Sequence, residues 1–152
     1  MATIEETIEK AVQAAVKRAN AYTDSKIPKV NYKHVKGQKV TLDSSTSSVE
    51  YTISMTTTGN PVFLLICGDS NPETTKVWIY ASILRGSTVL ATQYNESGVK
   101  SQNIPFSLAV IDSPSAGTYT YKARINLGNT AYSTTLGENN TNVPQFMAFE
   151  IH

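Results

Sequence analysis

The chain has 152 residues, enough for one domain of ordinary size and a short appendage. Its 40% hydrophobic content excludes a disordered chain, and its formal net charge of +1 gives no electrostatic reason to expect nucleic acid or a membrane surface as a partner. Only 16% of the residues are charged, so Ser, Thr, Asn and Tyr must supply most of the polar surface, as is common in β-rich proteins that work in exposed, external places.

An amphipathic helix is predicted at the start of the chain, over residues 1–27. Thr3 and Glu6 have the spacing of a capping box. Pro28 disfavours helical geometry at the residue before it, so the helix should end near residue 24 to 26. The apolar positions follow one another at alternating intervals of four and three residues, which is the spacing of a coiled-coil seam. These seam positions are Ile8, Val12, Ala15, Ala19 and Tyr22.

Two interpretations of this helix stay open. In the first, helices of several copies form a short parallel coiled coil, a stalk through which the protein attaches to a larger particle. In the second, the helix lies on the β domain of its own chain. Because alanines occupy part of the seam and the helix is short, a coiled coil would need a β domain that also associates.

Residues 28–37 are expected to be a linker and residues 38–152 a β domain. Apolar residues alternate with polar ones in SVEYTISMTTT, which starts at Ser48, and the run VFLLIC at 62–67 is typical of a strand covered on both faces. A hairpin is predicted between 77–84 and 88–94, with its turn at Arg85-Gly86-Ser87. Further strands are predicted at 39–42, 104–111, 118–127, 130–135 and 145–151. This pattern of short strands without an intervening helix predicts an antiparallel sandwich of the jelly-roll type.

Three of the predicted strands are apolar on both faces, which is more than one small core can bury. They are 62–67, 77–84 and 146–151. The surplus predicts that one face or edge of the β domain packs against identical chains, as in a homotrimer. We assign Tyr80, Phe146 and Phe149 to this interface.

Two stretches of the chain resemble parts of phage structural proteins. ANAYTDSKI, residues 19–27, is similar to the end of the helical collar in phage and prophage fibre proteins. IPFSLAVIDSPSAGTYTYKARI, residues 104–125, and FMAFEI, residues 146–151, resemble the C-terminal part of phage trimeric jelly-roll domains with a tumour-necrosis-factor-like fold. In that family a turn of the type Asp-x-Pro-x-Ala-Gly-Thr-Tyr, here 112–119, leads into a long strand, and the last strand runs up the middle of the subunit. The resemblance implies a homotrimeric virion protein.

Residues suited to catalysis are scarce and lie in no known motif. The two histidines are His34, in the expected linker, and His152 at the end of the chain, and no nucleophile elbow is present. The loop carboxylates are Asp69, Glu73, Glu96, Asp112 and Glu138. GDSNPE, residues 68–73, gathers oxygen ligands without the spacing of an EF-hand, and Cys67 is expected to be a buried small hydrophobe. We therefore expect no catalytic residue, no metal and no cofactor.

Recognition of a saccharide is the remaining chemical possibility. Aromatic faces stack on sugar rings and amide groups read hydroxyls, and the chain has 8 tyrosines and one tryptophan. Tyr132, Asn139 and Asn140 are the candidate ligand-binding residues. For most of the tyrosines and for Trp78, a place in the core or in a subunit interface is the expectation.

The sequence thus predicts a non-enzymatic, homotrimeric virion protein, a head fibre or capsid decoration that attaches to the capsid or another virion protein through its helix. The alternative is a tail-tip protein that binds a host receptor or cell-surface glycan. The chain has neither a leader for secretion nor an apolar run near the roughly 18 residues of a membrane span. It is therefore expected to be made in the host cytoplasm and to act in the virion.

Overall fold

In the computed structural model, residues 4–26, 31–138 and 142–151 are described. They belong to two compact units, an N-terminal helix and a β unit whose first described residue is Asn31. The helix α1 spans Ile4–Lys26. It ends within the range predicted from Pro28, whereas the predicted N-cap Thr3 lies outside the described residues. No helix in the described part is long and apolar enough to cross a membrane.

The β unit contains ten strands in the described residues. They are β1 (Tyr32–Lys36), β2 (Val40–Leu42), β3 (Ser48–Thr57), β4 (Val62–Pro72), β5 (Val77–Arg85), β6 (Thr88–Ser97), β7 (Ile104–Asp112), β8 (Gly117–Leu127), β9 (Thr134–Leu136) and β10 (Gln145–Glu150).

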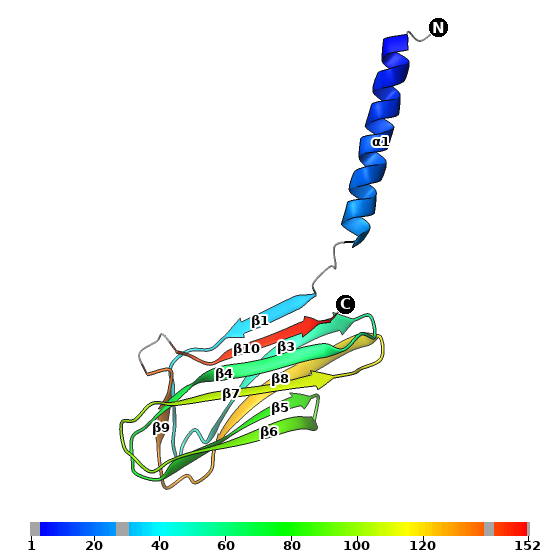
Figure 1. Ribbon diagram of the computed structural model, residues 1–152. Coiled ribbons are helices and arrows are strands. Elements are labelled where there is room, and N and C mark those ends of the chain that lie inside the picture. The colour runs from blue at the N-terminus through cyan, green and yellow to red at the C-terminus, as the bar shows by residue number, and fades with distance from the viewer. Residues whose placement is uncertain (1–3, 27–30, 139–141, 152) are drawn as a thin grey trace. The chain divides into compact units, whose positions relative to one another are not determined.

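These strands form two antiparallel sheets that pack face to face (Figure 1). Sheet A has the order β1-β10-β4-β9-β2, with β7 also paired to β4, and sheet B has the order β3-β8-β5-β6. From β3 to β8 the chain crosses between the sheets at every connection except the β5–β6 hairpin. This connectivity confirms the predicted jelly-roll sandwich preceded by one helix.

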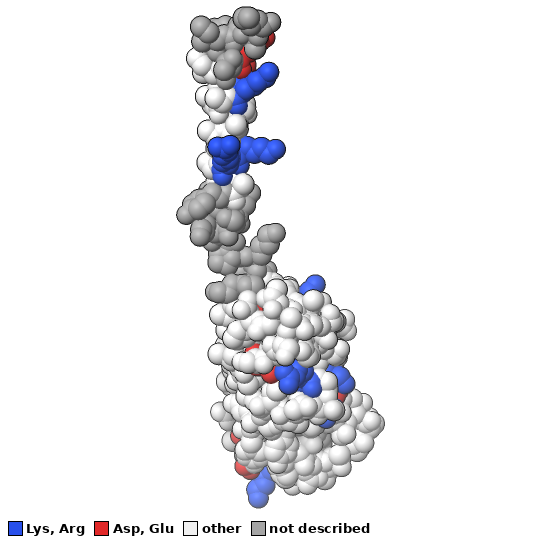
Figure 2. Space-filling view, turned by 90° about the vertical axis from the view of Figure 1, so that its right-hand side faces the viewer, with Lys and Arg blue, Asp and Glu red and all other residues white. Residues whose placement is uncertain are grey.

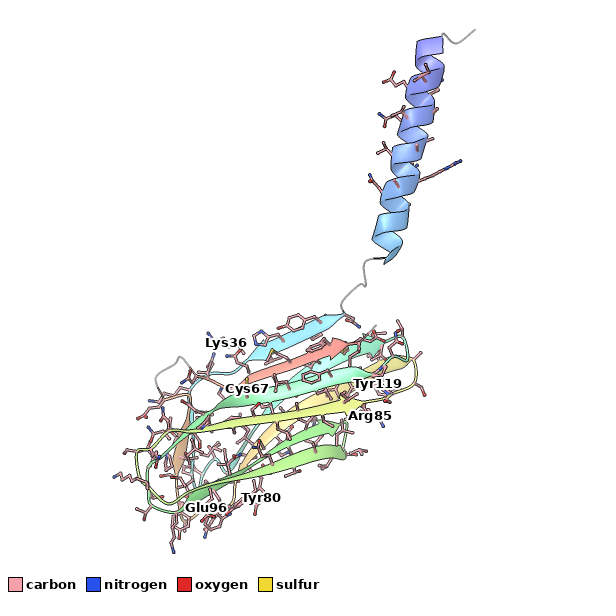
Figure 3. The ribbon with its side chains drawn as sticks, viewed as in Figure 1. Lys36, Cys67, Tyr80, Arg85, Glu96 and Tyr119 are labelled. Carbon is pink, nitrogen blue, oxygen red and sulfur yellow. The ribbon has the colours of Figure 1, made fainter. Side chains whose placement is uncertain are left out.

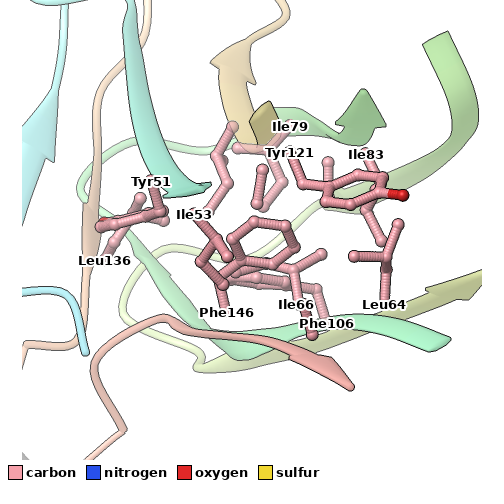
Figure 4. Packing of buried hydrophobic residues seen from close by; sticks show 14 of the residues in the cluster. Tyr51, Ile53, Leu64, Ile66, Ile79, Ile83, Phe106, Tyr121, Leu136 and Phe146 are labelled. Carbon is pink, nitrogen blue, oxygen red and sulfur yellow. The ribbon is translucent and has the colours of Figure 1, made fainter. Parts of the chain in front are cut away.

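The core lies between the two sheets and is built from alternate residues of the long strands (Figure 4). β3 contributes Ile53, β4 contributes Leu64, and β10 contributes Phe146, each at most 3% exposed. A register shift between Ile83 and Leu84 lets two consecutive residues of β5 both be buried.

A charged cluster links the two sheets at the predicted turn after β7. Asp112 of β7 is 7% exposed and accepts two hydrogen bonds of 3.0 Å from Nη1 of Arg85, at the end of β5. The hydroxyl of Tyr121, on β8, donates to Oδ2 of the same carboxylate over 2.9 Å. Burial and this hydrogen bond raise the pKa of Tyr121, so its hydroxyl stays protonated. The aspartate of the Asp-x-Pro turn therefore fastens sheet A to sheet B.

Two predicted boundaries are wrong. The expected linker 28–37 contains β1, which pairs with β10 from Tyr32–Phe149 to Lys36–Gln145. The strand predicted at 130–135 is reduced to β9, because the side chain of Asn129 accepts a hydrogen bond from the backbone of Ala131 and turns the chain there.

Candidate self-association site

The outer face of sheet A carries a group of large apolar side chains. On β4, Val62, Leu64 and Ile66 are buried in the core, so the residues between them point away from it. β10 lies beside β4 and follows the same alternation. The outward-facing residues are Phe63 and Leu65 on β4 and Met147 and Phe149 on β10. Together with Ile111 on the neighbouring strand β7, we call them the sheet A patch.

The strand register brings these residues together across three strands. Phe63 pairs with Phe149 of β10 on one side and with Ile111 of β7 on the other, and Leu65 pairs with Met147. The rings of Phe63 and Phe149 stack with their centroids 4.9 Å apart. Four members of the patch are half-buried and Ile111 is 58% exposed. The outer face of a sheet in a sandwich is normally polar where it meets water, so this apolar patch is a candidate contact surface.

Polar groups border the patch at one end. In the next row of the register, Cys67 pairs with Gln145 of β10 and with Ser107 of β7. Gln145 also bonds the ring of His34 on β1, with 2.6 Å between Oε1 and Nε2. Cys67 was predicted to be buried in the core, but it is half-buried on the outer face. Its partial burial raises the pKa of its thiol. Figure 3 shows Cys67 on β4.

The helix has an exposed apolar stripe of its own. Ile8 is 58% exposed, Val12 53% and Val16 50%. Ala15 and Ala19 are also exposed, whereas the side chain of Tyr22 lies outside the described part of the chain. Ile8, Val12, Ala15 and Ala19 belong to the predicted coiled-coil seam, which stays a prediction.

The three residues assigned to the interface of the β domain from sequence do not share a surface. Phe149 belongs to the sheet A patch. Phe146 has no exposed surface, so its assignment to an interface between chains is wrong. Tyr80 lies on the outer face of sheet B, away from Phe149, and its assignment to the interface stays a prediction. The other members of the patch were not assigned from sequence: Phe63 and Leu65 come from 62–67, Ile111 from 104–111 and Met147 from 146–151. The signal in the sequence was that 62–67 and 146–151 are apolar on both faces.

The residues proposed for ligand binding are only partly described. Tyr132 is half-buried, and its ring lies 5.7 Å from that of Trp78. Asn139 and Asn140 lie outside the described residues. Trp78 packs closely on Gly128, where an added Cβ would come within 1.8 Å of the indole ring. Side chains at this end of sheet B are therefore fixed by packing.

The carboxylates named from sequence have structural partners. Asp69 is 6% exposed and accepts hydrogen bonds of 3.2 Å from the backbone of Gly137 and from the amides of Asn103 and Asn142. Other bonds join Glu73 to Thr135, Glu96 to Tyr94 and Glu138 to Asn71. Among the described residues there is no group of three or more His, Cys, Asp and Glu that could hold a metal ion. On the face of the β unit seen in Figure 2, charged side chains are few and scattered.

Comparisons with known proteins give a coarse likeness in fold. No family model matches the chain, and no curated protein matches it. Similar solved structures include the insecticidal delta-endotoxin Cry8Ea1 from Bacillus thuringiensis, with a TM-score of 0.47 and 10% identity over 76% of this chain and 20% of that one. Another is the CBM36-1 domain of a xylanase from the hindgut metagenome of Trinervitermes trinervoides, with a TM-score of 0.47 and 9% identity over 80% of this chain and 98% of that one.

A third similar structure is the VP2 subviral particle of infectious bursal disease virus, with a TM-score of 0.46 and 9% identity over 81% of this chain and 37% of that one. This chain therefore spans about a fifth of the endotoxin and little more than a third of VP2. At these values the likenesses carry no function over to this chain.

Proposed function

We propose that this chain is a non-enzymatic, homotrimeric structural protein of a phage virion, displayed on the particle as a head fibre or capsid decoration. The observation that carries the proposal is the sheet A patch. A lone copy leaves these five apolar side chains partly in water, whereas packing against identical copies would bury them.

The arrangement of the strands supports a trimer of the resembled kind. In the phage jelly-roll trimers the last strand runs up the middle of the subunit, and here β10 lies between β1 and β4. β10 also contributes Met147 and Phe149 to the patch. An interface that includes β10 and β4 would therefore be apolar.

The helix would add to the same association. Its stripe of Ile8, Val12 and Val16 is too weak for a stable coiled coil alone, because isolated seams of this length with alanines bury little area. Held parallel by three associated β units, the helices would share that stripe along one axis. In this proposal the helical stalk attaches the protein to the capsid or to another virion protein.

Labelling of virions tests the role directly. Gold-labelled antibodies raised against the whole chain are applied to virions purified from the phage or induced prophage that encodes it. Label on the head supports the proposal. Label confined to the tail tip would favour the alternative role in host receptor binding, and virions without label would overturn both roles.

Receptor or glycan recognition is compatible with the same assembly. Association through the outer face of sheet A would leave the outer face of sheet B directed to the solvent, because the two sheets face opposite ways (Figure 1). A surface for recognition would then belong on sheet B.

A further inference from the structure

The outer face of sheet B carries aromatic rings of a different kind from the sheet A patch. Tyr80 of β5 pairs with Tyr94 of β6, and their ring centroids are 5.5 Å apart at an angle of 55°. Tyr80 is 38% exposed and Tyr94 50%. Trp78 lies two residues before Tyr80 on the same face of β5 and packs against Tyr132. We call Tyr132, Trp78, Tyr80 and Tyr94 the aromatic strip.

Hydrogen-bonding groups accompany the strip along its length. The hydroxyl of Tyr94 donates to Oε2 of Glu96 over 2.6 Å, and Figure 3 shows Tyr80 and Glu96 at the same end of the sheet. Asn126 of β8 lies beside Tyr80 in the register. In the adjoining row, the hydroxyls of Ser82 and Thr92 lie 3.0 Å apart. The rings of Tyr80 and Tyr94 therefore have hydrogen-bonding groups beside them or in the next row.

We propose that the aromatic strip binds a neutral polysaccharide. A sugar ring presents C–H groups on its face and hydroxyls around its rim, so it is matched by aromatic faces with hydrogen-bonding groups beside them. Trp78, Tyr80 and Tyr94 lie on the paired strands β5 and β6, and Tyr132, in the loop before β9, packs on Trp78, so the rings are held in place before binding. A linear chain of sugars would follow the strip along β5. This inference does not depend on the trimer, because it uses the other sheet.

Charge on the same face favours a neutral ligand over a nucleic acid. Single-stranded nucleic acids need a positive groove beside stacking rings. Here Arg124, at 2.5 Å, and Lys122, at 3.3 Å, share the one carboxylate of Glu50, which leaves a net charge of +1 on the three groups. Glu96 adds a negative charge next to Tyr94, and its hydrogen bond raises the pKa of Tyr94 to about 12, so that ring stays uncharged. With Glu96 the four charged groups sum to zero, so a phosphate backbone would find no positive groove on this face.

The polarity of the strip separates it from a protein-binding surface. The sheet A patch consists of Phe, Leu, Ile and Met, whereas every exposed ring of the strip has a hydroxyl and polar neighbours. Protein interfaces bury an apolar centre and keep polar groups at the rim. On this chain the sheet A patch has that composition and the aromatic strip does not.

Electrophoresis in native gels tests the proposal with four neutral polysaccharides cast into the gel: mixed-linkage β-glucan, galactan, mannan and dextran. At least one should retard the unmodified chain. Changing Tyr80→Ala together with Tyr94→Ala should weaken that binding about tenfold or more, because both stacking faces are removed. Tyr32→Ala removes a tyrosine from sheet A that is as exposed as Tyr94, and should leave the retardation unchanged. Circular dichroism checks that the variants are folded.

Fluorescence provides a second measurement that needs no substitution. Trp78 is the only tryptophan of the chain and lies within the strip, so its emission should shift and saturate as the retarding polysaccharide is added. Three results would each overturn the proposal: no retardation by any of the four polysaccharides, retardation that survives the double substitution, or retardation without a change in Trp78 emission. Binding of a polythymidine oligonucleotide that needs both tyrosines would overturn the neutral ligand in favour of a nucleic acid.

Discussion

Replacing Leu65 by Glu should separate the subunits without unfolding them. In a single chain Leu65 is half-buried on the outer face of β4, so the new carboxylate would remain in water. The free energy of unfolding of one β unit should then change by about 1 kcal/mol or less. In the proposed trimer the same carboxylate would be forced into the contact between sheet A patches.

The size of the effect follows from burial. Losing the half of the leucine side chain that association would bury costs about 1 kcal/mol, and desolvating an unpaired carboxylate adds several kcal/mol. A total of about 3 kcal/mol per chain corresponds to an association constant lowered more than about 100-fold. At micromolar concentration, Leu65→Glu should therefore be largely monomeric.

Light scattering after gel filtration measures this change. Thr52→Glu is the matched control, because it places the same charge on an exposed position of sheet B and should keep the mass of the unmodified protein. Circular dichroism should show the same β-sheet spectrum for both variants. If Leu65→Glu keeps the mass of the unmodified trimer, the sheet A patch is not the interface.

Three other predictions concern the helix, the link between the sheets and the aromatic strip. Val12→Glu with Ala15→Glu should weaken assembly, seen as a lower mass on dilution, and leave the β-sheet spectrum intact; an unchanged mass would remove the helix from the interface. Asp112→Asn should lower the free energy of unfolding in urea by about 2 kcal/mol, because Arg85 loses its charged partner but is one-third exposed and can regain water; a loss below about 0.5 kcal/mol would show that the link is not structural. Glu96→Gln should lower the pKa of Tyr94 from about 12 toward its ordinary value, followed by ¹³C NMR of labelled tyrosine, since the raised pKa comes first from the hydrogen bond to Glu96. That raised pKa favours the folded state below the ordinary tyrosine pKa, and the contribution is lost as the pH rises through 12; a pKa unchanged by Glu96→Gln would contradict the hydrogen bond.

The fold was largely predictable because alternating apolar residues and turn residues mark most of the strands in the sequence. The alternation around Ile53 and the Gly86 turn predicted β3 and the β5–β6 hairpin, although β6 continues to Ser97, beyond the predicted end at 94. β1 was missed because it is an edge strand whose residues are mostly charged or exposed, with Val35 alone packed toward the core. Such a strand differs little from a linker in composition.

The interface was harder to predict. Where a strand is apolar on both faces, apolar and polar residues no longer alternate, so the sequence does not show which side chains face the core. In FMAFEI nothing in the sequence distinguishes Phe146, which is buried, from Phe149, which is not. The direction of each is set by the pairing with β4, which lies about 80 residues earlier in the chain. The hydrogen bond between Asp112 and Arg85 could not be predicted either, because only the packing of the two sheets brings these two residues together.

The mass of the unmodified chain in solution tests the central claim, that copies of this protein share the sheet A patch. Native mass spectrometry across a dilution series is the most direct measurement. Three chains of 16.5 kDa should give a species of about 49.5 kDa at micromolar concentration. A single species of 16.5 kDa at every concentration would contradict the trimer and the structural role proposed from it.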